Sequence, residues 1–100
     1  MLTFNLKKQW FDKIKSGEKT HVYRVANDFW HTRIQNYIEY CNEYSKSMII
    51  CLECGYPKAD EKDKILYGKV IKEPYIINGK NTDLAIDKDV YDIEFELIGE

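Results

Sequence analysis

The residues with the clearest chemical potential lie close together, between Gly17 and Arg24. Lys19 follows the glycine by two positions, and its flexible ammonium can reach a phosphate or a carbonyl oxygen. Arg24, flanked by Tyr23 and Val25, can hold a phosphate or a base edge through two hydrogen bonds. It can equally pair with an acidic side chain and join a strand to a helix, and Lys19 can be an ordinary solubilising charge.

Aromatic and basic side chains occur together further along the chain. Trp30 and Arg33 lie one helical turn apart and can offer a base a stacking face and a cation, although Trp30 also heads an apolar stripe typical of a core. Tyr56 stands in a Gly-Tyr-Pro turn, where its ring can stack on a base or cover one end of the domain. The residues predicted to bind nucleic acid are Lys7, Lys8, Lys19, Arg24, Trp30, Arg33 and Tyr56.

Metal ligands are scarce. Cys51 and Cys54 have the spacing of half a zinc site, which needs four ligands. Completing it would take Cys41, His21 or His31, and residues three apart in a strand point to opposite faces. We therefore expect no metal and no cofactor. The two histidines are also candidates for acid–base chemistry near neutral pH, although surface imidazoles often have no such role.

The composition predicts one folded domain over residues 1–100. Hydrophobic residues make up 44% of the sequence and include 8 Tyr, 4 Phe and 2 Trp, which is enough for a packed core at this length. No internal repeat, low-complexity tract or linker divides the chain. We expect a monomer.

Charge is unevenly distributed. The formal net charge is −2, yet residues 1–33 carry seven basic and three acidic side chains, and the remainder carries eight basic and fourteen acidic ones. A basic end on an acidic body can steer a phosphate-bearing ligand to one place. An odd number of cysteines, no export signal and no apolar run longer than residues 48–52 predict a cytoplasmic protein without a membrane segment.

Hydrophobic periodicity predicts seven elements. Leu2, Phe4 and Leu6 alternate with polar residues as in a half-buried strand, and Gly17 is expected to stop the first helix. Asn27 or Asp28 can cap the second helix. The expected strands span residues 2–7, 19–25, 47–54, 64–72 and 90–98, and the expected helices residues 8–16 and 28–42.

The last strand has the cleanest alternation. It predicts four inward side chains against three outward carboxylates, the inward ones being Tyr91, Ile93, Phe95 and Leu97 and the outward ones Asp92, Glu94 and Glu96. Short connections and two helices cannot build a regular sheet of parallel strands, which needs a helix at each crossover. The order β-α-β-α-β-β-β therefore predicts an α+β fold with a mixed sheet that curls to hide its edges.

The segment Leu2 to Arg24 resembles the opening of the ASCH domain family, whose pattern after a strand and a helix is Gly-x-Lys-x-x-Glu-x-Arg. Gly17, Lys19 and Arg24 match it. The resemblance continues through Trp30 and Arg33, similar to the family's Trp-x-x-Arg, and through Gly-Tyr-Pro-Lys at residues 55–58. It covers essentially the whole chain, although residues 35–47 are longer than the family's usual connection.

The resemblance implies a small PUA-like mixed β-barrel of about five to six strands with two flanking helices. It also implies an RNA-related role, and a few similar members hydrolyse an acetylated cytidine nucleoside or RNA. The chain departs from the pattern at Val22, which replaces the family's glutamate or, in the acetylcytidine hydrolases, a threonine. An aliphatic side chain can neither accept a proton nor attack a carbonyl, so the catalytic pairing with Lys19 does not carry over.

Three functions follow in order of preference. The first is an RNA- or nucleotide-binding module with a pocket between the first two strands and the second helix. The second is a small hydrolase of a modified nucleoside or of RNA, in which Lys19 is catalytic and another group replaces the missing partner, the candidates being Tyr23, Thr20, Glu53 and Glu94. The third is a protein-interaction or accessory factor that uses the acidic body.

Overall fold

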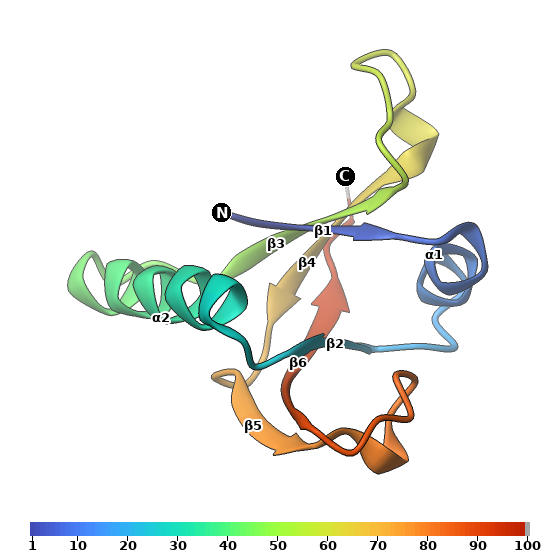
Figure 1. Ribbon diagram of the computed structural model, residues 1–100. Coiled ribbons are helices and arrows are strands. Elements are labelled where there is room, and N and C mark those ends of the chain that lie inside the picture. Colours follow the sequence, from blue (N-terminus) through green and yellow to red (C-terminus); the bar gives the residue numbers. More distant parts are fainter. Residues whose placement is uncertain (100) are drawn as a thin grey trace.

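The computed structural model describes residues 1–99, which form an α+β fold with two α-helices, as predicted, and six strands, within the five to six that the resemblance implied (Figure 1). Two short 3-10 helices, η1 (Lys62–Lys64) and η2 (Gly79–Asn81), lie in the connections. The longer elements are β1 (Leu2–Leu6), α1 (Lys8–Lys15), β2 (His21–Val25), α2 (Asp28–Glu43), β3 (Ile49–Cys54), β4 (Ile65–Val70), β5 (Tyr75–Asn78) and β6 (Asp89–Leu97).

The strands form one mixed, curled sheet in the order β1-β3-β4-β6-β2, with β5 added beside β6. β1 and β3 are parallel, and the other pairs are antiparallel. Figure 1 shows that curling brings β1 and β2, the two ends of this order, to the same side of the molecule, between α1 and α2. We call the line along which β1 faces β2 the β1–β2 seam.

Local chemistry explains where the elements begin and end. β1 alternates buried and exposed side chains as predicted. Gly17 follows α1 with a φ of +84°, a left-handed conformation that suits glycine and stops the helix. Asn27 caps α2, because its side-chain oxygen accepts a hydrogen bond of 2.9 Å from the backbone N–H of Trp30.

The core fills the inside of the curled sheet. Its apolar side chains come from every strand except β5 and from the inward faces of both helices. Burial of such side chains is the main force that holds a domain of this size together. The fully or nearly fully buried members include Phe4, Ile14, Val22, Ile34, Ile50, Leu52, Tyr91, Ile93 and Phe95.

Two expectations for the last strand were wrong. Asp92 is buried at 5% exposure although it was predicted to face water, and Leu97 is 38% exposed although it was predicted to face the core. β2 and β5 pair with the two edges of β6 at Asp92, and side chains from these strands, His21 and Tyr75, cover its carboxylate, whereas Leu97 lies at the end of β6. Asp92 is stabilised by side chains from both neighbouring strands, as described below.

The sequence patterns also missed β5 and placed the start of β2 two residues early, at Lys19 instead of His21. β5 has four residues, none of them buried, so it carries no alternation of apolar and polar side chains. Within residues 1–99, no helix has the length and apolar character needed to span a membrane.

Candidate functional site

An open groove of about 830 Å³ lies beside β1, β2 and α2. α2 supplies half of the lining residues, because Phe29, Arg33, Asn36 and Tyr40 follow one another at three- and four-residue spacing, with Tyr37 beside Asn36. Over this stretch α2 rises by about 16 Å. We call this hollow the aromatic groove. The other lining residues are Met1, Leu2, Thr3, Asn5, Arg24, Trp30 and Tyr56.

Trp30 belongs to both the core and the groove. Its ring stacks on the fully buried Phe4, with ring centroids 5.1 Å apart and an angle of 18° between the planes. Phe29 meets it edge to face at 5.1 Å. Both interpretations of Trp30 from the sequence, as a core residue and as a residue of the binding surface, are compatible with its position. It packs against the core while part of its surface lines the aromatic groove.

Arg24 lies at the floor of the groove, on the β1–β2 seam. Its guanidinium donates hydrogen bonds to the backbone oxygens of Asn5 in β1, at 2.9 Å, and Tyr23 in β2, at 2.8 Å. The guanidinium carbon lies 5.2 Å from the ring centroid of Phe4 and 5.5 Å from that of Trp30. Burial lowers the pKa of Arg24 from its ordinary value. Arg24 thus joins the two ends of the sheet through backbone carbonyls.

Arg33 and Tyr56 are the more accessible groups of the groove. The guanidinium carbon of Arg33 lies 3.5 Å from the ring centroid of Phe29, which holds the cation against an aromatic face. Tyr56 is 89% exposed in the turn after β3. Four predicted binding residues therefore line one groove, namely Arg24, Trp30, Arg33 and Tyr56.

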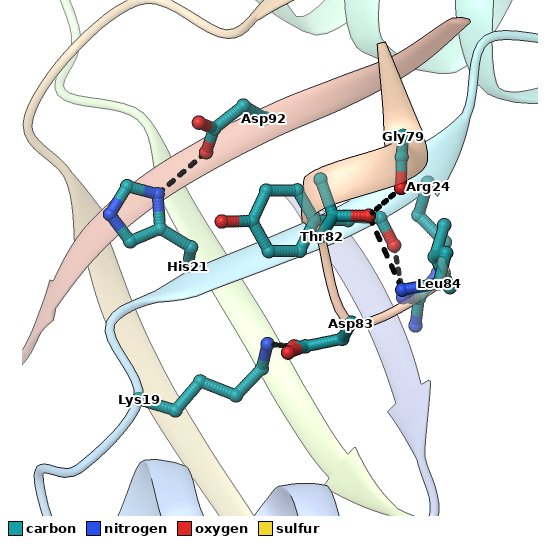
Figure 2. Close-up of polar contacts among 9 residues, drawn as sticks. Lys19, His21, Arg24, Gly79, Thr82, Asp83, Leu84 and Asp92 are labelled. Carbon is teal, nitrogen blue, oxygen red and sulfur yellow. Dashed lines mark hydrogen bonds and ion pairs between the residues drawn. The ribbon is translucent and has the colours of Figure 1, made fainter. Parts of the chain in front are cut away.

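Lys19 lies in a separate small cavity of about 60 Å³, which we call the Lys19 cavity. Its ammonium lies 5.0 Å from the ring centroid of Tyr23 and 5.6 Å from that of Trp10, and it forms an ion pair with Asp83 (Figure 2). Arg24 and Val22 line the same cavity, so the two cations of the predicted motif do converge.

The surroundings of Lys19 disfavour its charge. Burial, followed by the nearby positive charges of Arg24 and Lys13, lowers the pKa of Lys19 to about 8. The negative charge of Asp92 opposes this lowering of the pKa. The carboxylate of Asp83 contacts the ammonium directly. An amine with such a pKa can exchange protons near neutral pH or bind an anion.

Two open hollows adjoin the Lys19 cavity. The larger, of about 600 Å³, includes Lys7, and we call it the Lys7 hollow. The smaller, of about 250 Å³, includes Lys19 and His21, and we call it the His21 hollow. Lys8, by contrast, is an exposed residue of α1 that pairs with Asp12 at 2.6 Å and lines none of these four hollows.

His21 lies between carboxylates. Its Nδ1 is 2.6 Å from Oδ1 of the buried Asp92, and its Nε2 is 3.4 Å from Oε2 of Glu94. The hydroxyl of Tyr75 in β5 donates to the other oxygen of Asp92 at 2.9 Å. This network fastens β2 and β5 to β6 and explains why Asp92 is tolerated inside. The ring of His21 also stacks on that of Tyr23.

The remaining candidates lie apart from these hollows. Nδ1 of His31 is 2.7 Å from the hydroxyl of Tyr91, so this imidazole is tied to β6. Glu53 accepts a hydrogen bond from Asn5 on the outer side of β1 and β3. Among residues 1–99, no three His, Cys, Asp or Glu side chains come together as a metal site would require.

Sequence reasoning missed several residues of these hollows. The aromatic face of α2 was detectable, since Phe29, Arg33, Tyr37 and Tyr40 have helical spacing and run beside the apolar stripe. Asp83 was not detectable, because it lies in a connection without periodic pattern and meets Lys19 only through the tertiary fold.

No protein-family model and no curated protein matches the chain. The ASCH resemblance therefore stays a prediction that rests on the motif residues themselves.

Proposed function

We propose that the chain binds single-stranded RNA, or a nucleotide unit of it, in the aromatic groove. The observation that carries this proposal is the composition of the groove, in which five aromatic side chains and two arginines face a hollow of about 830 Å³. None of its lining residues is acidic within the part of the chain that the structure describes.

Each type of lining residue suits one part of a nucleotide. Exposed rings such as Phe29, Tyr40 and Tyr56 can stack on bases, and unpaired bases are the part of RNA that proteins read most readily. Arg33 supplies a cation at the edge of the groove, and the amide of Asn36 can donate and accept hydrogen bonds. The side-chain oxygen of Asn5 can accept one, while its NH2 group donates to Glu53 and to the backbone oxygen of Gly55. The resemblance of Gly17, Lys19 and Arg24 to the ASCH pattern points to the same ligand class.

The test is a fluorescence anisotropy titration of a labelled single-stranded RNA oligomer against the protein at several salt concentrations. We expect saturable binding that weakens as salt rises, because phosphate contacts release counterions. Tyr56→Ala should weaken binding by about five- to a hundredfold if its ring stacks on a base. Tyr67→Ala, which removes an exposed ring of β4 outside the groove, is the matched control and should leave affinity unchanged.

Competition experiments define which kind of nucleic acid binds in the groove. Unlabelled single-stranded DNA, duplex RNA and a mononucleotide are each added to the complex. Displacement by the single strands and weak displacement by the duplex are expected, since stacking requires splayed bases. Absence of saturable binding to the RNA oligomer at low salt would exclude the proposal.

Hydrolysis of a modified nucleoside or of RNA is the second candidate function. It is favoured by one observation, the pairing of Lys19, whose pKa is lowered to about 8, with the carboxylate of Asp83. It ranks second because the Lys19 cavity, at about 60 Å³, does not accommodate a nucleoside without rearrangement. Denaturing gels of the incubated RNA, and an acetylcytidine incubation, show directly whether either substrate is consumed.

A further inference from the structure

Asp83 belongs to a short segment, residues 82–86, that lies over Lys19; we call it the strap. It follows η2, and its own hydrogen bonds hold it together (Figure 2). The hydroxyl of Thr82 donates to the backbone oxygen of Gly79 at 2.8 Å and accepts from the N–H of Leu84 at 3.2 Å. The N–H of Ala85 donates to the backbone oxygen of Thr82 at 3.0 Å. The strap can therefore keep its shape when its contacts with the body change.

The base of the strap is anchored more firmly than its tip. The N–H of Gly79 donates to the backbone oxygen of Lys88 at 2.8 Å, and Asn78 donates to Asp87 at 3.0 Å. At the tip, among the residues that the structure describes, the polar contact between the strap and the rest of the domain is the ion pair of Asp83 with Lys19. Leu84 beside it is about one-third exposed. This ion pair is thus the latch of the strap.

The strap borders three neighbouring hollows at once. Asp83 lines the Lys19 cavity, the Lys7 hollow and the His21 hollow. Trp10 and Tyr23 also line all three, so they form a shared wall beneath the strap. Arg24 lines both the Lys7 hollow and the aromatic groove. Lifting the strap would join these spaces into one channel that runs along the β1–β2 seam.

The contact of Asp83 with Lys19 has the chemistry of a ligand contact. An ammonium flanked by two aromatic rings presents its free side to an anion, and the carboxylate of Asp83 takes that side. The side chain of Asp83 is 34% exposed and that of Lys19 only 13%, so the carboxylate can move out into solvent, whereas the ammonium left behind is largely buried and favours a replacement anion. A phosphate group carries at least as much charge and more acceptor oxygens, and can replace it.

We propose that Lys19 is a masked phosphate site, that Asp83 is its resident counterion, and that a phosphate of the bound strand displaces Asp83 and lifts the strap. This inference rests on the proposed function for the source of the phosphate. It assigns Lys19 and the aromatic groove to successive parts of one ligand, with Arg24 between them.

The experiment compares Asp83→Asn with Asp87→Asn in the RNA titration described above. Both substitutions remove one negative charge from the same connection, and Asp87 pairs with Lys80 at a distance of 3.7 Å instead of with Lys19. Asp83→Asn is expected to tighten RNA binding by about three- to tenfold, because one more phosphate can be neutralised without displacing a carboxylate. Asp87→Asn is expected to change it by less than about twofold, since long-range surface charge is screened.

The double variant Lys19→Met/Asp83→Asn locates the effect. If the phosphate binds at Lys19, the gain from Asp83→Asn disappears when Lys19 is replaced. Equal affinities of the Asp83→Asn and Asp87→Asn proteins, or a gain that persists without Lys19, would overturn the inference. Far-UV circular dichroism of each variant verifies that it is folded.

A second readout separates this inference from the proposed function. Inorganic phosphate is added at constant ionic strength, and the thermal unfolding midpoint is measured, since an anion that binds the native state raises it. A larger rise for Asp83→Asn than for the double variant supports the masked site even if no RNA binds. Identical phosphate-induced rises of the midpoint in those two proteins, together with identical RNA affinities, overturn it while leaving RNA binding in the aromatic groove intact.

Discussion

Lys19 keeps its amine in surroundings that favour the neutral form, and this has a consequence for stability. In the folded protein its pKa is lowered to about 8 from the ordinary value of 10.5, with burial as the largest cause. Between these two values the unfolded chain binds more protons at this residue than the folded chain does. Its charge therefore opposes folding below about pH 8, and this cost is relieved as the pH rises towards 10.5.

This cost can be measured by urea unfolding of the wild type and of Lys19→Met at a series of pH values. The unfolding free energy of the wild type, relative to that of Lys19→Met, should rise between about pH 8 and 10.5, by roughly 1–3 kcal/mol in total. Lys15→Met removes an exposed lysine from α1 and serves as the control for general charge effects. A difference between wild type and Lys19→Met that is flat across this window would contradict the lowered pKa.

At the scale of elements, Arg24 connects two strands that a continuous ladder of backbone hydrogen bonds would join in a closed barrel. β1 and β2 are the ends of the strand order, and the guanidinium of Arg24 bonds to a backbone oxygen of each. Without it, the oxygens of Asn5 and Tyr23 would lose their donor beside the rings of Phe4 and Trp30. The residue thus positions the two strands that border the candidate site, whether or not it also touches a ligand.

Arg24→Met is expected to lower the free energy of unfolding by about 2–4 kcal/mol, because two charge-assisted hydrogen bonds are lost. Arg24→Lys should recover little of this, since one ammonium lacks the planar geometry that reaches both strands. Chemical denaturation measures the loss, and amide hydrogen exchange should accelerate in β1 and β2. The control, Arg33→Met, removes an exposed arginine and should cost less than about 0.5 kcal/mol. Equal free energies of unfolding for the Arg24→Met protein and the wild type would show that Arg24 does not hold β1 and β2 together and only supplies a positive charge in the aromatic groove.

The sequence predicted the elements in which burial alternates regularly along the chain. It did not predict the features that depend on contacts between residues far apart in the sequence. The strand patterns at residues 2–6 and 89–97 and the apolar stripe of α2 identified the core and the fold class. Asp92 was misplaced because the alternation rule assumes a strand with one face exposed to water, whereas the side chains of Tyr75 and His21 cover that face of β6 at Asp92. β5 itself is short and unburied, so no periodicity marks it.

The residues of the candidate site likewise include some that the sequence predicted and some that it did not. The motif from Gly17 to Arg24 supplies both cations that line the Lys19 cavity, although their odd spacing along one strand did not predict that they share it. The partner of Lys19 was sought in Tyr23, Thr20, Glu53 or Glu94; the ring of Tyr23 does lie beside the ammonium, yet the carboxylate that meets it is Asp83. Such a partner follows from chain topology and not from spacing, so a single sequence does not reveal it.

At the scale of the whole molecule, the basic part of the sequence collects around the hollows. Of the seven basic residues in positions 1–33, five line the groove, the cavity or an adjoining hollow, namely Lys7, Lys13, Lys19, Arg24 and Arg33. The acidic excess lies in the rest of the chain. This arrangement can draw a polyanion towards the β1–β2 seam and away from other surfaces.

Gly68 in β4 leaves room in the core for the side chains of Phe95 in β6 and Ile50 in β3. A Cβ atom there would lie 2.8 Å from Cδ2 of Phe95 and 3.4 Å from Cγ1 of Ile50, and Phe95 is fixed in the core at 2% exposure. Gly68→Ala must therefore displace a buried ring, which should cost about 1–3 kcal/mol despite the reduced entropy of the unfolded chain. The thermal unfolding midpoint should fall by roughly 4–8 °C for each kcal/mol.

If residues 1–100 unfold as one cooperative unit, this fall should be the same for every probe. Tryptophan fluorescence reports on Trp10 and Trp30, at the strap and the aromatic groove, whereas far-UV circular dichroism reports on the sheet and helices. Gly99→Ala is the matched control, because no atom lies within 4 Å of a Cβ built there. An unchanged midpoint in Gly68→Ala would show that the sheet relaxes around the added methyl group. A shift seen by circular dichroism but not by fluorescence would show that the groove and the sheet unfold separately, and the hollows could then open without loss of the core.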